Sequence, residues 1–134
     1  MLKGIDVSYC QTNIDWQKVK NSGVDFVIIR AGYGKEINQK DKQFENHYTG
    51  AKAAGLYVGA YHYSYARSVN EAMQEADCFL EWIKDKHFEM PVYFNNWIKC
   101  WLSLAQNKHI FKTWLIPVVL NWHWVIFSIY HRIM

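Results

Sequence analysis

The feature that most constrains the fold is an alternation of apolar runs with amphipathic segments along the first 94 residues. Short runs rich in β-branched and aromatic residues, which are typical of strands, occupy residues 4–8, 26–30, 56–65 and 92–94. Segments with apolar side chains at helical spacing occupy residues 14–22, 44–54 and 70–86. The run at 26–30 is almost entirely apolar, as in a strand buried on both faces of a parallel sheet. The alternation therefore predicts an α/β fold in which parallel strands alternate with helices.

The expected helices carry local start and stop signals. Asn13 is expected to cap the first helix, and Gly23 to end it, because glycine tolerates the left-handed backbone conformation. Ser68 or Asn70 is expected to cap the third helix. That helix has an apolar stripe (Ala72, Ala76, Phe79, Leu80, Ile83) opposite a polar face (Glu71, Glu75, Glu81, Lys84, Asp85).

The composition changes abruptly after residue 94. The first 94 residues contain all 12 acidic residues and all 7 glycines, whereas residues 95–134 contain neither. Five of the 7 tryptophans, in contrast, lie in that second segment. A single domain normally distributes carboxylates and turn glycines along its length. We therefore expect two regions, the first at 1–94 and a divergent, aggregation-prone tail at 95–134.

Length and charge exclude several classes of protein. The chain has 134 residues and a net charge of +3, which suits one domain and does not indicate a nucleic-acid partner. The cysteines Cys10, Cys78 and Cys100 form no CxxC motif and no cluster with histidine. We expect free thiols and neither a metal nor a cofactor.

Two segments bear on localisation. The first residues lead directly into a strand pattern without an apolar leader, so we expect no signal peptide. We expect the chain to be synthesised in the cytoplasm. Residues 114–130 are apolar enough to approach the length of a short membrane span. Pro117, Asn121 and His123 interrupt that segment, so a membrane anchor is the least favoured interpretation.

Polar side chains stand at the ends of the first two predicted strands. In parallel α/β folds the working residues lie at the carboxyl ends of strands. Asp6 is expected either to cap the next turn or to point into a cleft. Arg30 is expected either to pair with a carboxylate or to bind a ligand. Residues 31–34, a lone GxG segment, are expected to form a loop and are weak evidence for phosphate binding.

The third predicted strand ends in tyrosines and a histidine. Tyr61, His62 and Tyr63, with Tyr33 from the second strand, either pack in the core or form a platform for sugars. Aromatic faces stack on pyranose C–H groups, while hydroxyl and imidazole groups bind sugar hydroxyls. A metal site at His62 is not expected, because no second ligand lies at a suitable spacing.

The fourth predicted strand leads into Asn95-Asn96-Trp97. This is the position where an enzyme of this architecture would carry its reactive groups. None of the three side chains can donate or accept a proton at neutral pH.

In order and spacing, six segments of the first 94 residues resemble the glycoside hydrolase family 25 lysozymes, the N-acetylmuramidases of bacterial autolysins and phage endolysins. The segments are Gly4-Ile5-Asp6-Val7-Ser8 with Gln11; Ile14-Asp15-Trp16; residues 26–34; Asp41 with Phe44 and Asn46; residues 51–64; and Pro91-Val92-Tyr93-Phe94. The resemblance implies an irregular β/α barrel similar to a TIM barrel. It also implies hydrolysis of the β-1,4 bond between N-acetylmuramic acid and N-acetylglucosamine in peptidoglycan, at the cell wall.

The same resemblance implies that this chain lacks essential catalytic groups. In the family the fourth strand ends in an Asp-x-Glu motif, whose positions here are Asn95 and Trp97. Asp6 matches the family's first-strand acid and remains. Substrate contacts are implied for the region of Arg30, Tyr33, Tyr61, His62 and Tyr63.

A shifted reading frame would account for the change at residue 95. Read from the third base of suitable codons, residues 114–121 give Ala-Asp-Thr-Cys-Cys-Leu-Glu, and the next codons give Leu-Ala-Leu-Gly-Tyr-Phe. A closed eight-stranded barrel takes about 200 residues or more, so we expect a truncated barrel with an open sheet edge that favours self-association. The leading hypothesis is an inactive lysozyme-family chain, and the alternative is a non-catalytic module that binds cell-wall sugars.

Overall fold

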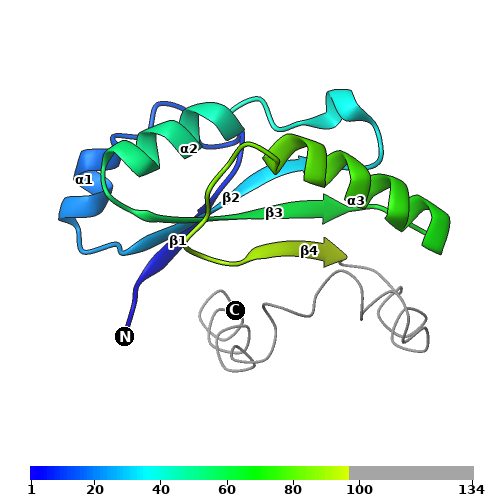
Figure 1. Cartoon of the computed structure of the whole chain (residues 1–134). Helices are drawn as coiled ribbons and strands as arrows, with labels where there is room; N and C mark the ends of the chain where they lie inside the picture. Colours follow the sequence, from blue (N-terminus) through cyan, green and yellow to red (C-terminus); the bar gives the residue numbers. More distant parts are fainter. Residues whose placement is uncertain (97–134) are drawn as a thin grey trace. The chain divides into compact units, whose positions relative to one another are not determined.

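The computed structural model describes residues 1–96, which form a four-stranded parallel sheet with its helices on one face (Figure 1). The strands run in the order β1-β2-β3-β4, so each strand pairs with the next along the chain. The elements are β1 (Gly4–Val7), α1 (Trp16–Asn21), β2 (Phe26–Tyr33), the 3₁₀ turn η1 (Ile37–Gln39), α2 (Phe44–Ala53), β3 (Tyr57–Ser64), α3 (Val69–Ile83) and β4 (Val92–Asn96).

The sequential strand order explains why the helices share a face. Parallel neighbours need crossover connections, and these are right-handed in nearly all proteins, so consecutive crossovers in one direction place their helices on one side. The predicted α/β class and the predicted strand–helix alternation are confirmed. Within residues 1–96 the sheet is open, and closure into a barrel is not seen.

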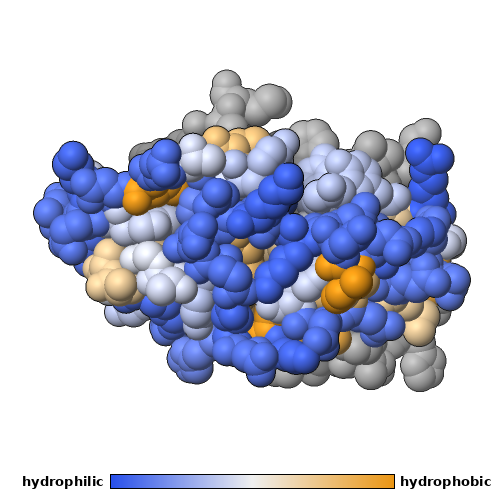
Figure 2. Space-filling model, turned by 90° about the horizontal axis from the view of Figure 1, so that it is seen from above, coloured by the Kyte–Doolittle hydropathy of each residue, from blue (hydrophilic) through white to orange (hydrophobic). Residues whose placement is uncertain are grey.

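The main core lies between the sheet and its helices. Val27, Ile29, Val58 and Ala60 from the two central strands are fully buried, and Phe44 of α2 packs with them. A smaller cluster on the opposite sheet face contains Phe26, Ile28 and Met90 with Tyr61 and Tyr93 packed against it. The outer surface of the helix layer is mainly hydrophilic with isolated apolar residues (Figure 2), as amphipathic helices require.

The helix ends confirm most of the local signals and correct one. Asp15, not Asn13, caps α1, since its side chain accepts a hydrogen bond from the Lys18 amide. Asn13 instead adopts a left-handed conformation with φ of 57°, which asparagine tolerates better than most residues. Gly23 follows α1 with φ of 85°, and Ser68 caps α3, both as predicted.

Two further expectations about the elements were wrong. The GxG segment is not a loop, because β2 continues through Tyr33 and the Trp82 ring packs against Gly32. On α3 the expected polar residue Glu75 is buried, whereas Leu80 is 40% exposed. The tertiary contacts of α3 with the sheet override the simple two-faced pattern there.

The predictions for the C-terminal segment, including those for Trp97 and the apolar stretch 114–130, concern residues outside the described part of the chain. Among residues 1–96 no helix has the length and hydropathy needed to cross a bilayer.

Candidate functional site

The register of the sheet brings the predicted site residues into two rows near the carboxyl ends of the strands. Arg30 pairs with Tyr61, which pairs with Tyr93. Further along, Tyr33 pairs with Tyr63, whose partner on β4 is residue 95. Because side chains alternate along a strand, residues 61 and 63 share a sheet face and residue 62 takes the other.

Arg30 pairs with a carboxylate, which is the first of the two alternatives that the sequence left open for it. Its Nε and Nη2 lie 2.8 and 2.7 Å from Oδ2 of Asp41. The Arg30 side chain is 15% exposed and that of Asp41 is 0% exposed. The chain reaches this geometry because Asp41 follows η1 and its own amide donates to the Ala31 carbonyl.

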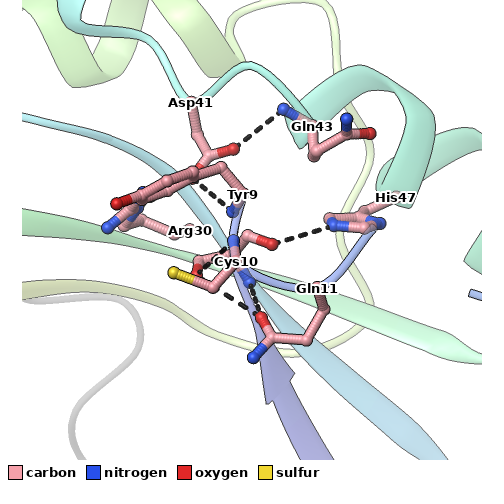
Figure 3. A network of polar contacts seen from close by, with 8 residues as sticks. Tyr9, Cys10, Gln11, Arg30, Asp41, Gln43 and His47 are labelled. Atoms are coloured by element: carbon pink, nitrogen blue, oxygen red, sulfur yellow. Dashed lines mark hydrogen bonds and ion pairs between the residues drawn. The ribbon is translucent and has the colours of Figure 1, made fainter. Parts of the chain in front are cut away.

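Asp41 also organises the loop that follows β1 (Figure 3). Its Oδ2 accepts a hydrogen bond from the Tyr9 amide at 3.0 Å, and its Oδ1 accepts one from the Gln43 amide at 2.9 Å. From the other side, Nε2 of the buried His47 lies 3.1 Å from the Ser8 carbonyl oxygen. The loop is therefore held by two groups from outside it, the Asp41 carboxylate and the His47 imidazole.

Exposed tyrosines gather around this ion pair. The Cζ atom of Arg30 lies 4.7 Å from the ring centre of Tyr9 and 5.8 Å from that of Tyr33. Tyr33 and Tyr63 each make an edge-type contact with Tyr65. Tyr9, Tyr33 and Tyr65 are 52%, 37% and 63% exposed.

Sequence reasoning did not single out Tyr9, Asp41 or Tyr65 for roles at the site. Tyr65 ends the same aromatic run as Tyr63, so its position offered a signal. The sequence contains no comparable signal for Tyr9 and Asp41, because their contact joins residues 32 positions apart.

Asp6 is exposed and makes no capping contact in the described structure, since Gln11 accepts from the Ser8 amide and Asp15 caps α1. Burial, together with the nearby Asp6 carboxylate, raises the pKa of Tyr61 to about 12 against the opposing effect of Arg30. Tyr61 is therefore a neutral hydroxyl group at physiological pH, next to the acid on β1.

His62 is placed differently from its predicted neighbours. It is 0% exposed and lies on the helix-covered face, stacked on Phe94 at 4.9 Å and on Trp82 at 5.7 Å between ring centres. Its Nε2 lies 3.3 Å from Glu75 Oε2, and its Nδ1 is buried without a partner. The geometry gives His62 no exposed surface for a sugar, in contrast to the expectation that it contacts substrate.

Glu75 is the other half of this buried contact. Burial alone would raise the pKa of its carboxyl group. Hydrogen bonds from His62, Ser64 and the Tyr65 amide outweigh that effect and hold the pKa below its ordinary value of 4.5. The pair therefore ties α3 to the end of β3, directly beneath the exposed tyrosines.

The position expected to carry the first acid of the Asp-x-Glu motif lies on the described part of β4. The backbone of Asn95 pairs with Tyr63, which places residue 95 at the carboxyl edge. The second position, Trp97, lies outside the described residues. Of the carboxylates near this edge in residues 1–96, Asp41 is occupied by four donors and Asp6 is exposed.

This arrangement offers hydrogen-bond donors, hydroxyl groups and aromatic faces, which suit a polar ligand with apolar faces such as a sugar. Within residues 1–96 no three histidine, cysteine or acidic side chains come together as a metal site would require. Among these groups Asp6 is the one exposed acid.

A parallel α/β sheet with polar and aromatic side chains at its carboxyl edge defines the class of α/β proteins whose sites lie at strand ends. Within that class the chain belongs to the glycosyl hydrolases family 25, whose sequence profile matches residues 5–113. The match begins at β1 and extends beyond Phe94, where the composition changes.

The chain is similar to several lysozymes. It is 40% identical over 78 residues to lysozyme M1 of Streptomyces globisporus, covering 58% of this chain and 26% of that protein. It is 40% identical over 82 residues to the autolytic lysozyme of Clostridium acetobutylicum, covering 61% and 24%. The chain thus spans about a quarter of the length of these curated relatives.

A solved structure gives the same result. The modular autolysin LytC of Streptococcus pneumoniae, in complex with a synthetic peptidoglycan ligand, superimposes with a TM-score of 0.64 at 31% identity. The similarity covers 73% of this chain and 23% of LytC. It confirms the resemblance to family 25 lysozymes.

Proposed function

We propose that this chain presents a lysozyme-type site to peptidoglycan glycan strands but does not hydrolyse them. The relevant reaction is that of the family, cleavage of the β-1,4 bond between N-acetylmuramic acid and N-acetylglucosamine. The observation that carries the proposal is the residue at the end of β4. Position 95 is in register with Tyr63 at the carboxyl edge, and it is an asparagine.

The physical reason is the proton requirement of glycoside cleavage. A carboxylic acid normally protonates the leaving oxygen, and a second carboxylate acts as nucleophile or base. General acid catalysis alone contributes about 10²–10⁴-fold to the rate. Trp97 cannot donate the proton, and Asn95 supplies no negative charge to the oxocarbenium-like transition state. Asp6 alone provides one carboxylate where two are needed.

A cell-wall lysis assay tests this proposal. We expect the purified chain to leave the turbidity of a peptidoglycan suspension unchanged over hours, while a muramidase of the same family clears it. Clearing by this chain at a comparable rate would refute the proposal.

Binding without catalysis makes the chain a sugar-binding module, the alternative that the sequence left open. It is favoured by the exposed tyrosines around Arg30, which are intact although the acids of β4 are absent. We expect the chain to sediment with insoluble peptidoglycan. Tyr65→Ala should reduce this retention several-fold, because Tyr65 is 63% exposed at the carboxyl end of β3.

Tyr57→Ala is a matched control, since Tyr57 is 51% exposed but lies at the opposite end of the same strand. Equal retention of both variants and wild type would count against binding through the exposed tyrosines Tyr9, Tyr33 and Tyr65. If the wild-type chain stays in the supernatant, the chain is better described as a non-functional remnant of a lysozyme than as a binding module.

We further infer that the partners are glycan strands rather than nucleic acid, and that the chain reaches them at the cell wall. The role in sugar contact is assigned to Tyr33, Tyr61 and Tyr63, with Arg30 beside them. An open sheet edge presents unpaired backbone groups. Self-association through it should appear as concentration-dependent oligomers in analytical ultracentrifugation.

A further inference from the structure

We propose that the Asp41–Arg30 pair is a positioning device that holds the rings of Tyr9 and Tyr33 as stacking surfaces for one N-acetylated pyranose. This inference rests on the proposed function and assigns the part of the site that recognises the sugar ring. It gives Arg30 an indirect role, through the aromatic rings beside it.

The first step concerns Asp41, which is fixed on both of its oxygen atoms. Oδ2 accepts from Arg30 and from the Tyr9 amide, and Oδ1 accepts from the Gln43 amide. The side chain has no exposed surface. A buried carboxylate that accepts from four donor atoms offers no exposed oxygen to a ligand, so its contribution is structural order.

The second step concerns the charge of Arg30. Nε and Nη2 both contact the same Asp41 oxygen, at 2.8 and 2.7 Å. The positive charge is therefore already compensated, and the exposed Asp6 carboxylate adds negative charge nearby. The charge of Arg30 is therefore already used within the chain, and the planar face of the guanidinium group remains as its contact surface.

The third step concerns the rings on that surface. The guanidinium carbon lies 4.7 Å from the Tyr9 ring centre and 5.8 Å from that of Tyr33. These distances are within the range of cation–π attraction, about 6 Å. Both rings are nevertheless 52% and 37% exposed, so they are held in place without being buried.

The fourth step is that Tyr9 is held twice by the same pair. Its backbone amide donates to Asp41, and its ring lies over Arg30. An exposed ring that is already ordered loses little conformational entropy when a ligand stacks on it, which increases affinity. The apolar C–H face of a pyranose is the part of a glycan that such a ring contacts.

The experiment uses the full chain and the tetrasaccharide of alternating N-acetylglucosamine and N-acetylmuramic acid. Arg30→Lys retains the charge and can still pair with Asp41, but it has no planar face. We expect its affinity for the tetrasaccharide, measured by calorimetry, to fall about tenfold, and Tyr9→Ala to cause a similar loss. In the Tyr9→Ala background, Arg30→Lys should cost much less than it does alone, because much of its effect passes through that ring.

A control and a second readout separate this role from general stability. Lys35→Ala removes an exposed ion pair with Glu71 and should leave the affinity unchanged. Thermal unfolding of each variant confirms that it is folded at the temperature of the titration. Hydrogen exchange at the Tyr9 amide should accelerate in Asp41→Asn, since the acceptor of that amide is weakened.

The outcomes are distinct. A wild-type chain that binds the tetrasaccharide while Arg30→Lys binds equally well overturns the positioning role alone. Fully additive losses from the two substitutions also overturn it. A wild-type chain that does not bind the tetrasaccharide overturns the proposed function and this inference together.

Discussion

At the scale of single residues, His62 and Glu75 form a buried polar contact that joins β3 to α3 beneath Tyr65. The pattern of α3 placed Glu75 on a polar face, and the structure buries it against His62. Periodicity could not reveal this, because it describes one helix and not its partner across the sheet. Sequence periodicity likewise could not identify Asp41 as the partner of Arg30, because the two side chains meet only in the folded chain.

Removing that buried carboxylate should be costly. Glu75→Ala leaves the Tyr65 amide and the His62 Nε2 atom without their acceptor, and an unsatisfied buried group costs about 1–3 kcal/mol. Urea unfolding measures the loss. Glu81→Ala on the exposed side of α3 is the control and should change stability by less than about 0.5 kcal/mol. Equal effects of the two substitutions would contradict the buried contact.

At the scale of elements, β2 shows where local sequence reading succeeded and where it stopped. The apolar run predicted the strand, but the GxG signature suggested that it ended at Arg30. The strand continues because Gly32 makes room for the Trp82 ring of α3. A glycine that serves a close approach looks the same in the sequence as a glycine that serves a turn.

This explanation predicts a specific steric cost. A Cβ atom at position 32 would lie 2.2 Å from Cζ3 of Trp82, so Gly32→Ala should destabilise the chain by about 1–3 kcal/mol through overpacking. Trp82→Leu in the same chain should recover part of that loss by opening space beside the strand. Thermal unfolding of the single and double variants checks both expectations. A Gly32→Ala variant as stable as wild type would show that α3 does not pack there.

The turn that leads into β4 predicts a pH dependence. Burial would raise the pKa of Glu89, but hydrogen bonds from Lys52 and the Val58 amide outweigh it and lower the pKa from 4.5 to about 2. A lowered native pKa means that this stabilisation is complete above pH 4.5 and disappears as the pH falls toward 2. Because the pair is partly exposed, its contribution should stay below about 1 kcal/mol.

The melting temperature of Glu89→Gln tests this sign. The melting temperature of the variant should lie below that of wild type at pH 6. The difference should shrink steadily as the pH falls toward the lowered pKa of about 2. A constant difference across this range would mean that the carboxylate charge of Glu89 does not stabilise the fold.

At the scale of the whole molecule, the sequence predicted the α/β class, the alternation of parallel strands with helices and the family, because these depend on patterns repeated over residues 4–94. The stacking surfaces of the site were less accessible, since Tyr9 and Asp41 come together only through loop geometry. The match of the family profile to residues 5–113 shows that similarity to the family continues past the change in composition. We propose a shifted reading frame for the remaining divergence.

The genetic code gives this proposal a firm test. Tryptophan has the single codon TGG, so a frame read from its third base begins each such codon with G. Trp97-Ile98 must then read as Asp and Trp124-Val125 as Gly, the residue types that the segment 95–134 lacks. Sequencing the gene should show an open overlapping frame with family-like sequence there. Stop codons throughout that frame would contradict the proposal.

The central claim, that position 95 and position 97 leave the site without the acids it needs, is tested most directly by the release of reducing ends from purified peptidoglycan. The account predicts that the purified chain releases no more reducing ends than its Asp6→Asn variant, with both at the level of buffer alone. Release by the wild-type chain well above buffer, abolished by Asp6→Asn, would contradict it.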